Sequence, residues 1–242
     1  MELKKLLKST TFTLIFTGML ASSAFAAGTG DNPTPTMDIP TLKQQQMLPK
    51  KMKELQIHKD RAESKYHIMA LGDLQTVGVT PFKQETTYWC GPATTKQVLN
   101  YLNSSSESQS YYAKKLGTTK DGTDFTIVDD VLNNLQSQYT YSYSTSLNFE
   151  TWKYAIMYSS DKYHPAVLDL KITGNELENY TGTVSGHIIN VSGYDFRTND
   201  AKVRLTDPYD QGNRGKTHGN KWYSLDKVYQ ANQNHFRQAI IW

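Results

Sequence analysis

The chemistry available to this sequence begins with its one cysteine, Cys90, in the segment TTYWCGPATT. Tyr88 and Trp89 precede it, and Gly-Pro-Ala follows. A cysteine thiolate is a strong nucleophile, so one interpretation is a reactive site. The alternatives are an intermolecular disulfide and a small buried hydrophobic residue, because cysteine outside disulfides is among the most buried residue types. Composition by itself favours the buried residue.

A nucleophilic Cys90 would need help to ionise. An ordinary thiol has a pKa of about 8.5, so half-ionisation at pH 7 requires about 2 kcal/mol of added preference for the thiolate. Pro92, with apolar residues at helical spacing after it, predicts a helix that begins near Cys90. A helix N-terminus supplies only about 0.3 to 1 kcal/mol. The sequence should therefore hold a histidine close to Cys90.

Among the six histidines, His187 has the clearest structural context. It opens the alternating segment HIINVSG, and as a strand residue it shares a face with Ile189 and Val191. His164 precedes a proline and is expected in a loop. The remaining four are expected to be solvated surface residues: His58, His67, His218 and His235.

A carboxylate to orient His187 is predicted from the hairpin that follows. Centring this hairpin at Arg197 pairs Val191 with Val203 and places Asp207 opposite His187, where cross-strand Cβ atoms lie about 5 Å apart. Such a carboxylate would fix the imidazole tautomer and stabilise the imidazolium. By itself, an aspartate followed by a proline is more simply interpreted as a turn.

An oxyanion formed by attack on a carbonyl needs hydrogen-bond donors. The backbone N–H of Cys90 is one candidate. The side-chain amide of Gln84, six residues upstream, is the second, provided that its loop folds back over the helix start. An exposed loop glutamine would ordinarily have no such role, so this assignment depends on the other residues.

Taken together, these motifs resemble a known family. The matching segments are Gln84, WCGPAT (89–94), Gly186-His187, Gly193-Tyr194-Asp195 and Leu205-Thr206-Asp207-Pro208. Their order and spacing resemble the C39-type cysteine peptidases, a papain-like group that includes bacteriocin-leader peptidases and stand-alone C39-like relatives. The resemblance runs from about Val79 to the C-terminus.

The resemblance implies roles for these residues. Cys90 would be the nucleophile, His187 the general base and acid, Asp207 the orienting carboxylate and Gln84 the oxyanion donor. Substrate-binding candidates are Tyr88, Trp89 and Gly186. The implied fold is papain-like α+β, with N-terminal helices packed on an antiparallel sheet. No transporter or nucleotide-binding segment accompanies the motifs, so a double-glycine leader substrate is not implied.

The elements that must position these residues follow from periodicity. Apolar spacing and turn residues predict four helices: from Cys90 to the serines at 104, over 108–117, from Phe125 to Leu135, and after an Asn148 cap. Alternation predicts strands at 139–144, 165–172, 186–194 and 201–207. Helices followed by strands favour an α+β domain.

Three regions are predicted along the chain. Residues 1–26 combine lysines, a short apolar run and Ala-Phe-Ala, which is typical of a secretory signal peptide and predicts a secreted protein. Residues 27–77 are expected to be a linker or a pro-region that covers the cleft, with a helix from Lys50 to Tyr66 interrupted upstream by Pro49. Residues 78–242 form the C39-like peptidase domain.

Charge and composition restrict the partners. Removing 26 residues from 242 leaves 216, and the three Lys and one Glu of the signal peptide take the net charge from +3 to +1. This balance argues against a nucleic-acid partner, and no later segment is apolar enough to span a membrane. We expect no cofactor and no metal. A peptide or protein substrate is expected, and the oligomeric state is not indicated.

Three functional classes stay open at this point. The first is a secreted cysteine peptidase that works through a thioester acyl-enzyme. The second is an acyltransferase or transpeptidase that uses the same triad but passes the acyl group to an amine. The third is a non-catalytic module in which Tyr88 and Trp89 bind a peptide or a cell-wall polymer.

Overall fold

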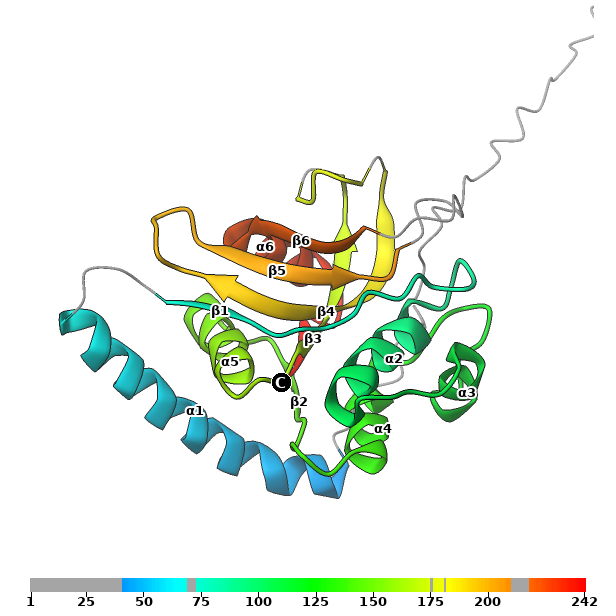
Figure 1. The fold of residues 1–242 in the computed structure, drawn as a ribbon, viewed down its shortest axis with the longest axis horizontal. Coiled ribbons are helices and arrows are strands. Elements are labelled where there is room, and N and C mark those ends of the chain that lie inside the picture. The colour runs from blue at the N-terminus through cyan, green and yellow to red at the C-terminus, as the bar shows by residue number, and fades with distance from the viewer. Residues whose placement is uncertain (1–40, 69–72, 175, 181, 210–217) are drawn as a thin grey trace, which may run out of the picture.

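The computed structural model describes five stretches of the chain: residues 41–68, 73–174, 176–180, 182–209 and 218–242. The predicted signal peptide, residues 1–26, lies outside them. The described chain is an α+β domain in which helices cover both faces of one antiparallel sheet (Figure 1). The predicted fold class is therefore confirmed.

The sheet contains seven strands, all paired antiparallel. Six follow the order β2 (Tyr143–Thr145), β7 (Ala239–Ile241), β3 (Ala166–Ile172), β4 (Val184–Asp195), β5 (Lys202–Asp207) and β6 (Gly219–Ser224). The short strand β1 (Leu74–Thr76) pairs with the end of β4, along the edge that β3 leaves after Val191. The two longest central strands, β3 and β4, are buried on both faces.

Helices of the N-terminal half cover one face of the sheet. They are α2 (Cys90–Asn103), α3 (Gln109–Lys115) and α4 (Val128–Leu135), the last preceded by a 3-10 turn (Phe125–Ile127). Val98 and Leu99 of α2 belong to the same apolar cluster as Val167 of β3 and Ile188 of β4. Burial of this face holds the start of α2 against the middle of β4.

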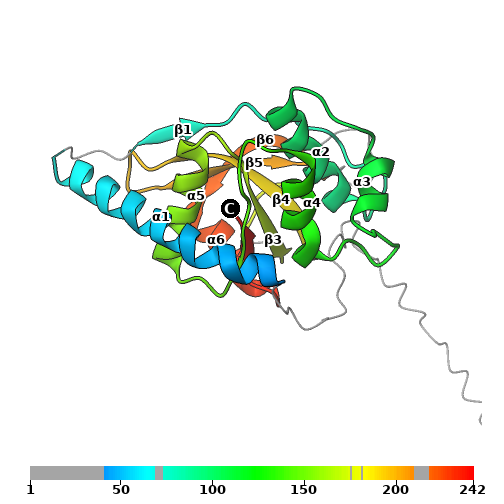
Figure 2. The same ribbon diagram turned by 90° about the horizontal axis from the view of Figure 1, so that it is seen from below.

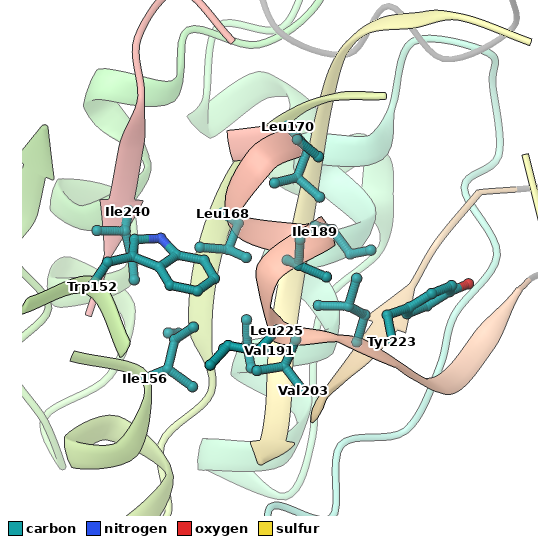
Figure 3. Packing of buried hydrophobic residues seen from close by; sticks show 14 of the residues in the cluster. Trp152, Ile156, Leu168, Leu170, Ile189, Val191, Val203, Tyr223, Leu225 and Ile240 are labelled. Atoms are coloured by element: carbon teal, nitrogen blue, oxygen red, sulfur yellow. The ribbon is translucent and has the colours of Figure 1, made fainter. Parts of the chain in front are cut away.

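The opposite face packs against α5 (Phe149–Asp161) and α6 (Leu225–Asn234). Figure 3 shows Trp152 and Ile156 of α5 and Leu225 of α6 against the alternate residues of the sheet, among them Leu168 and Ile189. Alternate residues of β3 enter this cluster and Val167 enters the opposite one, so the strand is apolar except at Asp169 and Lys171, as its sequence PAVLDLKI predicts for a central strand.

The predicted helix boundaries hold where a local signal marks them. Asn148 caps α5 by accepting a hydrogen bond from the Thr151 N–H at 2.9 Å, and Ser104 ends α2 in the left-handed conformation with φ of 58°. The strands β1, β6 and β7 and the helix α6 were not predicted. Each is either three residues long or largely polar.

Helix α1 (Leu42–Ile68) differs from the prediction, because it begins eight residues before Lys50 and continues through Pro49. An internal proline costs a helix about 3 kcal/mol. Packing offsets this cost: Leu55 is buried in the core, and Gln44 Nε2 donates to the Asp129 carboxylate at 2.9 Å. Figure 2 shows α1 crossing α5, with which it is in contact. The pro-region role stays a prediction.

The β4–β5 hairpin has a different register from the predicted one, in which Val191 pairs with Val203. Val191 pairs with Leu205, so that prediction is wrong by two residues. A bulge between Val191 and Gly193 shifts the pairing by one. Near the turn, Tyr194 pairs with Val203. If that register continued along the hairpin without the bulge, Asp207 and His187 would lie on opposite faces of the sheet. The bulge restores the shared face.

Candidate active site

Cys90 is the first residue of α2 and is 0% exposed. Its Sγ accepts a hydrogen bond from the backbone N–H of Ile188 at 3.1 Å, which places the sulfur beside the residue after His187. The first turn of α2 carries no acidic side chain to oppose the positive helix end. Both the helix end and this N–H donor favour the thiolate over the thiol.

A close approach explains why glycine follows the cysteine. A Cβ atom built at Gly91 would lie 2.4 Å from Oγ1 of Thr123, which is fully buried. Thr123 is itself held by a 2.8 Å hydrogen bond with the Thr118 hydroxyl. The loop before α4 therefore packs directly on the start of α2, and only glycine fits between them.

His187 and Asp207 form a hydrogen-bonded pair with no solvent exposure. His187 Nε2 lies 2.8 Å from Asp207 Oδ1, and both side chains are 0% exposed. The Tyr180 hydroxyl donates to Asp207 Oδ2 at 2.5 Å, and the Tyr209 backbone N–H donates to Oδ1 at 2.9 Å. The carboxylate is thus held from three directions.

Electrostatics keep Asp207 ionised despite its burial. Burial raises the pKa of this carboxyl, but the charge and hydrogen bond of His187, the charge of His218 and the Tyr180 hydroxyl together hold it below its usual value. Burial and the neighbouring Asp207 charge raise the pKa of Tyr180 well above its ordinary value. Tyr180 therefore remains a protonated donor, and Asp207 remains the acceptor.

The second imidazole nitrogen of His187 is available for chemistry. Asp207 occupies Nε2, while Nδ1 is buried and has no hydrogen-bond partner among the described residues. Cys90 Sγ accepts from the backbone N–H of Ile188, the residue after His187, so the sulfur lies beside the strand residue that follows the imidazole.

Aromatic rings that the sequence analysis did not single out surround this pair. Tyr209 and His218 stack with centroids 5.2 Å apart, and Tyr180 lies 4.9 Å from Tyr209 and 4.8 Å from His218. His187 meets both Tyr180 and Tyr209 edge-on at 6.0 Å. One local signal in the sequence could have indicated Tyr209. It lies two residues after Asp207, and an aspartate commonly accepts a hydrogen bond from the backbone N–H at that position.

Two histidines expected at the surface are buried instead. His218 is 6% exposed within this aromatic group, and His235 is 1% exposed beside Asp169. Both expectations were wrong, because polar sequence neighbours do not reveal packing across the sheet. His58 is partly buried against Asp161, the loop residue His164 is half-buried, and the side chain of His67 lies outside the described residues.

Gln84 is fully buried in the loop between β1 and α2. Its backbone N–H donates to the Pro208 carbonyl at 2.9 Å, which ties it to the residue after Asp207. Its Nε2 donates to the Thr86 carbonyl at 2.9 Å, and its Oε1 is buried without a partner among the described residues. One amide hydrogen is thus committed to the loop, and a second is left.

Buried amides hold this loop over the start of α2. Gln97 of α2 donates to the Phe82 carbonyl at 3.0 Å and accepts from Asn190 of β4 at 2.6 Å. Gln109 of α3 donates to the Lys83 carbonyl at 2.6 Å. The loop is therefore fixed by the same elements that carry Cys90 and His187.

The predicted substrate-binding residues lie next to these groups in the chain. Tyr88 and Trp89 are half-buried and meet edge-on, and Trp89 is the cap residue of α2. Gly186 is buried in β4, directly before His187. Their contact with a substrate stays a prediction.

Comparisons with known proteins place the chain in a family. The family model described as the Peptidase_C39 like family matches residues 76–236. No curated protein matches the chain. One solved structure, the peptidase domain of Streptococcus ComA, described as a bi-functional ABC transporter involved in a quorum sensing pathway, is similar at 16% identity and a TM-score of 0.44. The match covers 68% of this chain and 96% of that chain.

Within the described residues, no helix is both long and apolar enough to cross a membrane. The α+β architecture, with a cysteine at the start of a helix packed on an antiparallel sheet, is a papain-like fold. The family model spans most of this domain and includes all four predicted catalytic residues. The chain therefore belongs to the Peptidase_C39 like family of cysteine peptidases.

Proposed function

We propose that this protein is a secreted cysteine peptidase that hydrolyses peptide bonds through a thioester acyl-enzyme. Cys90 is the nucleophile, His187 the general base and acid, and Asp207 the orienting carboxylate. One observation supports this most strongly: Cys90 Sγ is bonded to the N–H of Ile188 while the adjacent His187 is paired through Nε2 with a buried carboxylate.

The proposed reaction has two stages. In the first, the Cys90 thiolate adds to the scissile carbonyl, and the resulting oxyanion takes hydrogen bonds from the Cys90 N–H and from Gln84 Nε2. His187 then gives a proton from Nδ1 to the departing amine, which leaves a thioester. In the second, water loses a proton to His187, adds to the thioester and releases the acid, and the proton returns to the sulfur.

Asp207 serves this cycle by accepting the Nε2–H of His187 throughout, which keeps Nδ1 directed to the chemistry. The low dielectric around the fully buried pair strengthens that interaction. Because Cys90 and His187 are both 0% exposed, part of the chain that covers them has to move before a peptide can reach the sulfur.

A peptide-library digest tests the hydrolase activity. The secreted form of the chain should release new peptide termini, and Cys90→Ser should release none above background. Products that carry an added amine in a mixed peptide and amine pool would identify acyl transfer in place of hydrolysis. Peptide binding by Cys90→Ala with no turnover by the wild type would instead favour a binding module.

Thiol alkylation tests activation of the sulfur independently of any substrate. The wild type should react with iodoacetamide faster at pH 6 than His187→Ala does. The matched control is His58→Ala, which breaks another histidine–aspartate pair of the same 2.8 Å length away from Cys90. Equal alkylation rates in the wild type and His187→Ala would contradict the proposal that His187 activates the Cys90 thiol.

A further inference from the structure

A cavity separate from the predicted catalytic residues lies where α1 crosses the end of α5 and residues 137–140. Its volume is about 450 Å³. Its walls combine basic, aromatic and polar side chains: Met47, Lys50, Lys51, Glu54, Ser137, Gln138, Tyr139, Thr140, Tyr158, Lys162 and His164. Binding pockets for small molecules typically have volumes of about 300 to 1,000 Å³.

Lys51 is the unusual residue in this cavity, because it is only 5% exposed. Its Nζ donates to the Tyr139 hydroxyl at 2.7 Å. The ring centroids of Tyr139, Trp242 and Tyr158 lie 4.0, 4.8 and 5.2 Å from the same nitrogen. Aromatic faces attract a cation, but they supply less than a carboxylate would.

No described carboxylate comes within ion-pair distance, 4.0 Å, of the Lys51 nitrogen. Glu54 is the acidic residue whose charge raises the pKa of Lys51. Its carboxylate accepts a hydrogen bond from the Tyr158 hydroxyl at 2.7 Å rather than from Lys51. Burial lowers the pKa of Lys51 to about 7, with Glu54 raising it only in part. A buried ammonium without an adjacent counter-ion is costly, so an anion in the cavity would stabilise it.

The other charged residues that line the cavity also favour an anionic ligand. Lys50 and Lys162 also line the cavity, against Glu54 as the one carboxylate among the lining residues. The half-buried imidazole of His164 also lines the cavity. Three lysines thus line the cavity together with one carboxylate, which is already hydrogen-bonded.

A second hollow of about 300 Å³ adjoins the first and shares Glu54, Tyr158 and Lys162 with it. It adds Arg61 and His58 from the next turns of α1. A ligand larger than a single oxyanion could therefore extend along α1 and meet a further positive charge.

We propose that the cavity between α1 and α5 is a binding site for a small organic anion. A carboxylate or phosphate group of the ligand lies between Lys51 and Lys162, with Lys50 at the rim, and the tyrosine rings contact its nonpolar part. This site does not depend on the proposed peptidase reaction, since none of its residues comes from α2, β4 or β5.

Binding should be coupled to proton uptake. An anion favours the charged form of Lys51, so a fraction of the neutral amine present at pH 7.5 would be protonated on binding. The titratable groups that face this nitrogen are Glu54, Tyr139, Tyr158, Lys50, Lys162 and His164. Burial also lowers the pKa of His164, so the imidazole of this residue can take up a second proton when an anion binds.

Titration calorimetry of the full chain at constant ionic strength provides the test, with citrate, inorganic phosphate and glycerol as probes. Citrate or phosphate should bind with proton uptake, measured as a difference in heat between two buffers of different ionisation enthalpy, and glycerol should not bind. Comparison of the citrate and phosphate arms identifies which oxyanion the site prefers.

Three variants locate the binding. Lys51→Met and Lys162→Met should each weaken the anion about tenfold, roughly the loss of one charge-assisted contact, and Lys51→Met should lose most of the proton uptake. Lys53→Met, an exposed position on the same helix outside the cavity, should match the wild type. If Lys51→Met does not fold, the anion affinity of Lys162→Met, a change at an exposed residue, tests the proposal instead. Absence of binding, or equal binding to all variants, would overturn the proposal.

Discussion

Two aspartates of this protein each contact a histidine and a tyrosine hydroxyl, in different surroundings. Asp207 accepts from His187 at 2.8 Å and from the Tyr180 hydroxyl at 2.5 Å. Asp161 accepts from His58 at 2.8 Å and from the Tyr194 hydroxyl at 2.7 Å. A histidine, an aspartate and a tyrosine in hydrogen-bond contact are therefore not sufficient evidence for a catalytic site.

Burial and neighbours separate the two groups. Both side chains of the Asp207 pair are 0% exposed, whereas those of His58 and Asp161 are 18% and 33% exposed. Exposed ion pairs contribute about 0 to 1 kcal/mol because water competes for both partners. Next to the Asp207 pair in the chain, the Ile188 N–H donates to Cys90 Sγ, and in the proposed mechanism the orientation of the His187 imidazole therefore affects the nucleophile.

The largest expected difference between the two groups is in turnover. Asp207→Asn should lower kcat/KM by about three orders of magnitude, because an amide no longer fixes the imidazole tautomer. Asp161→Asn is the matched control and should change kcat/KM less than twofold. Peptide hydrolysis by the two variants, with folding checked by circular dichroism, measures both. Comparable losses would mean that Asp207 has no special role.

A smaller effect is expected from the two tyrosines. Tyr180→Phe should lower kcat about tenfold and the free energy of unfolding by about 1 to 2 kcal/mol, because it leaves Oδ2 of a buried carboxylate without its donor. It should also change the pH profile of kcat/KM, which a purely structural role would not do. Tyr194→Phe removes the hydroxyl that Asp161 accepts from and should leave kcat and this profile unchanged. A pH profile identical to the wild type in Tyr180→Phe would exclude a positioning role.

The smallest expected difference is in acid stability. The pKa of Asp207 is lower in the folded state than in the unfolded chain, so the unfolded state binds more protons in the acidic range. The stabilisation by this carboxylate is complete above its unfolded pKa of about 3.9 and is lost as the pH falls through the folded value. Urea unfolding from pH 5 downward should therefore show a shallower fall in stability for Asp207→Asn than for Asp161→Asn. Equal slopes would contradict this.

The contact between His187 and Asp207 could be predicted from the sequence even though the predicted register was wrong. On the His187 side of the bulge the predicted register of β4 and β5 was wrong by two residues, and an even error leaves the side chains there on their predicted faces. His187 and Asp207 therefore still meet. The start of α2 was predicted because Pro92 and the apolar spacing are local signals, and local signals do not depend on the rest of the fold.

Other features could not be predicted because distant packing creates them. Tyr180 lies in an irregular segment without periodicity, and only the fold brings its hydroxyl to Asp207. Helix α1 continues through Pro49 because contacts with α4 and α5 outweigh a local signal to stop. The burial of Lys51 likewise depends on rings contributed from residues 139, 158 and 242.

The complete burial of Cys90 has a consequence for the lifetime of the protein. Peroxides and disulfides attack thiolates, and the rate of attack follows both thiolate character and access. Burial shields Cys90 from hydrophilic oxidants, and the sequence holds no second cysteine that could convert a sulfenic acid to an internal disulfide. In the proposed function, the fraction of time during which Cys90 is accessible would then set the rate of its oxidation as well as the rate of catalysis.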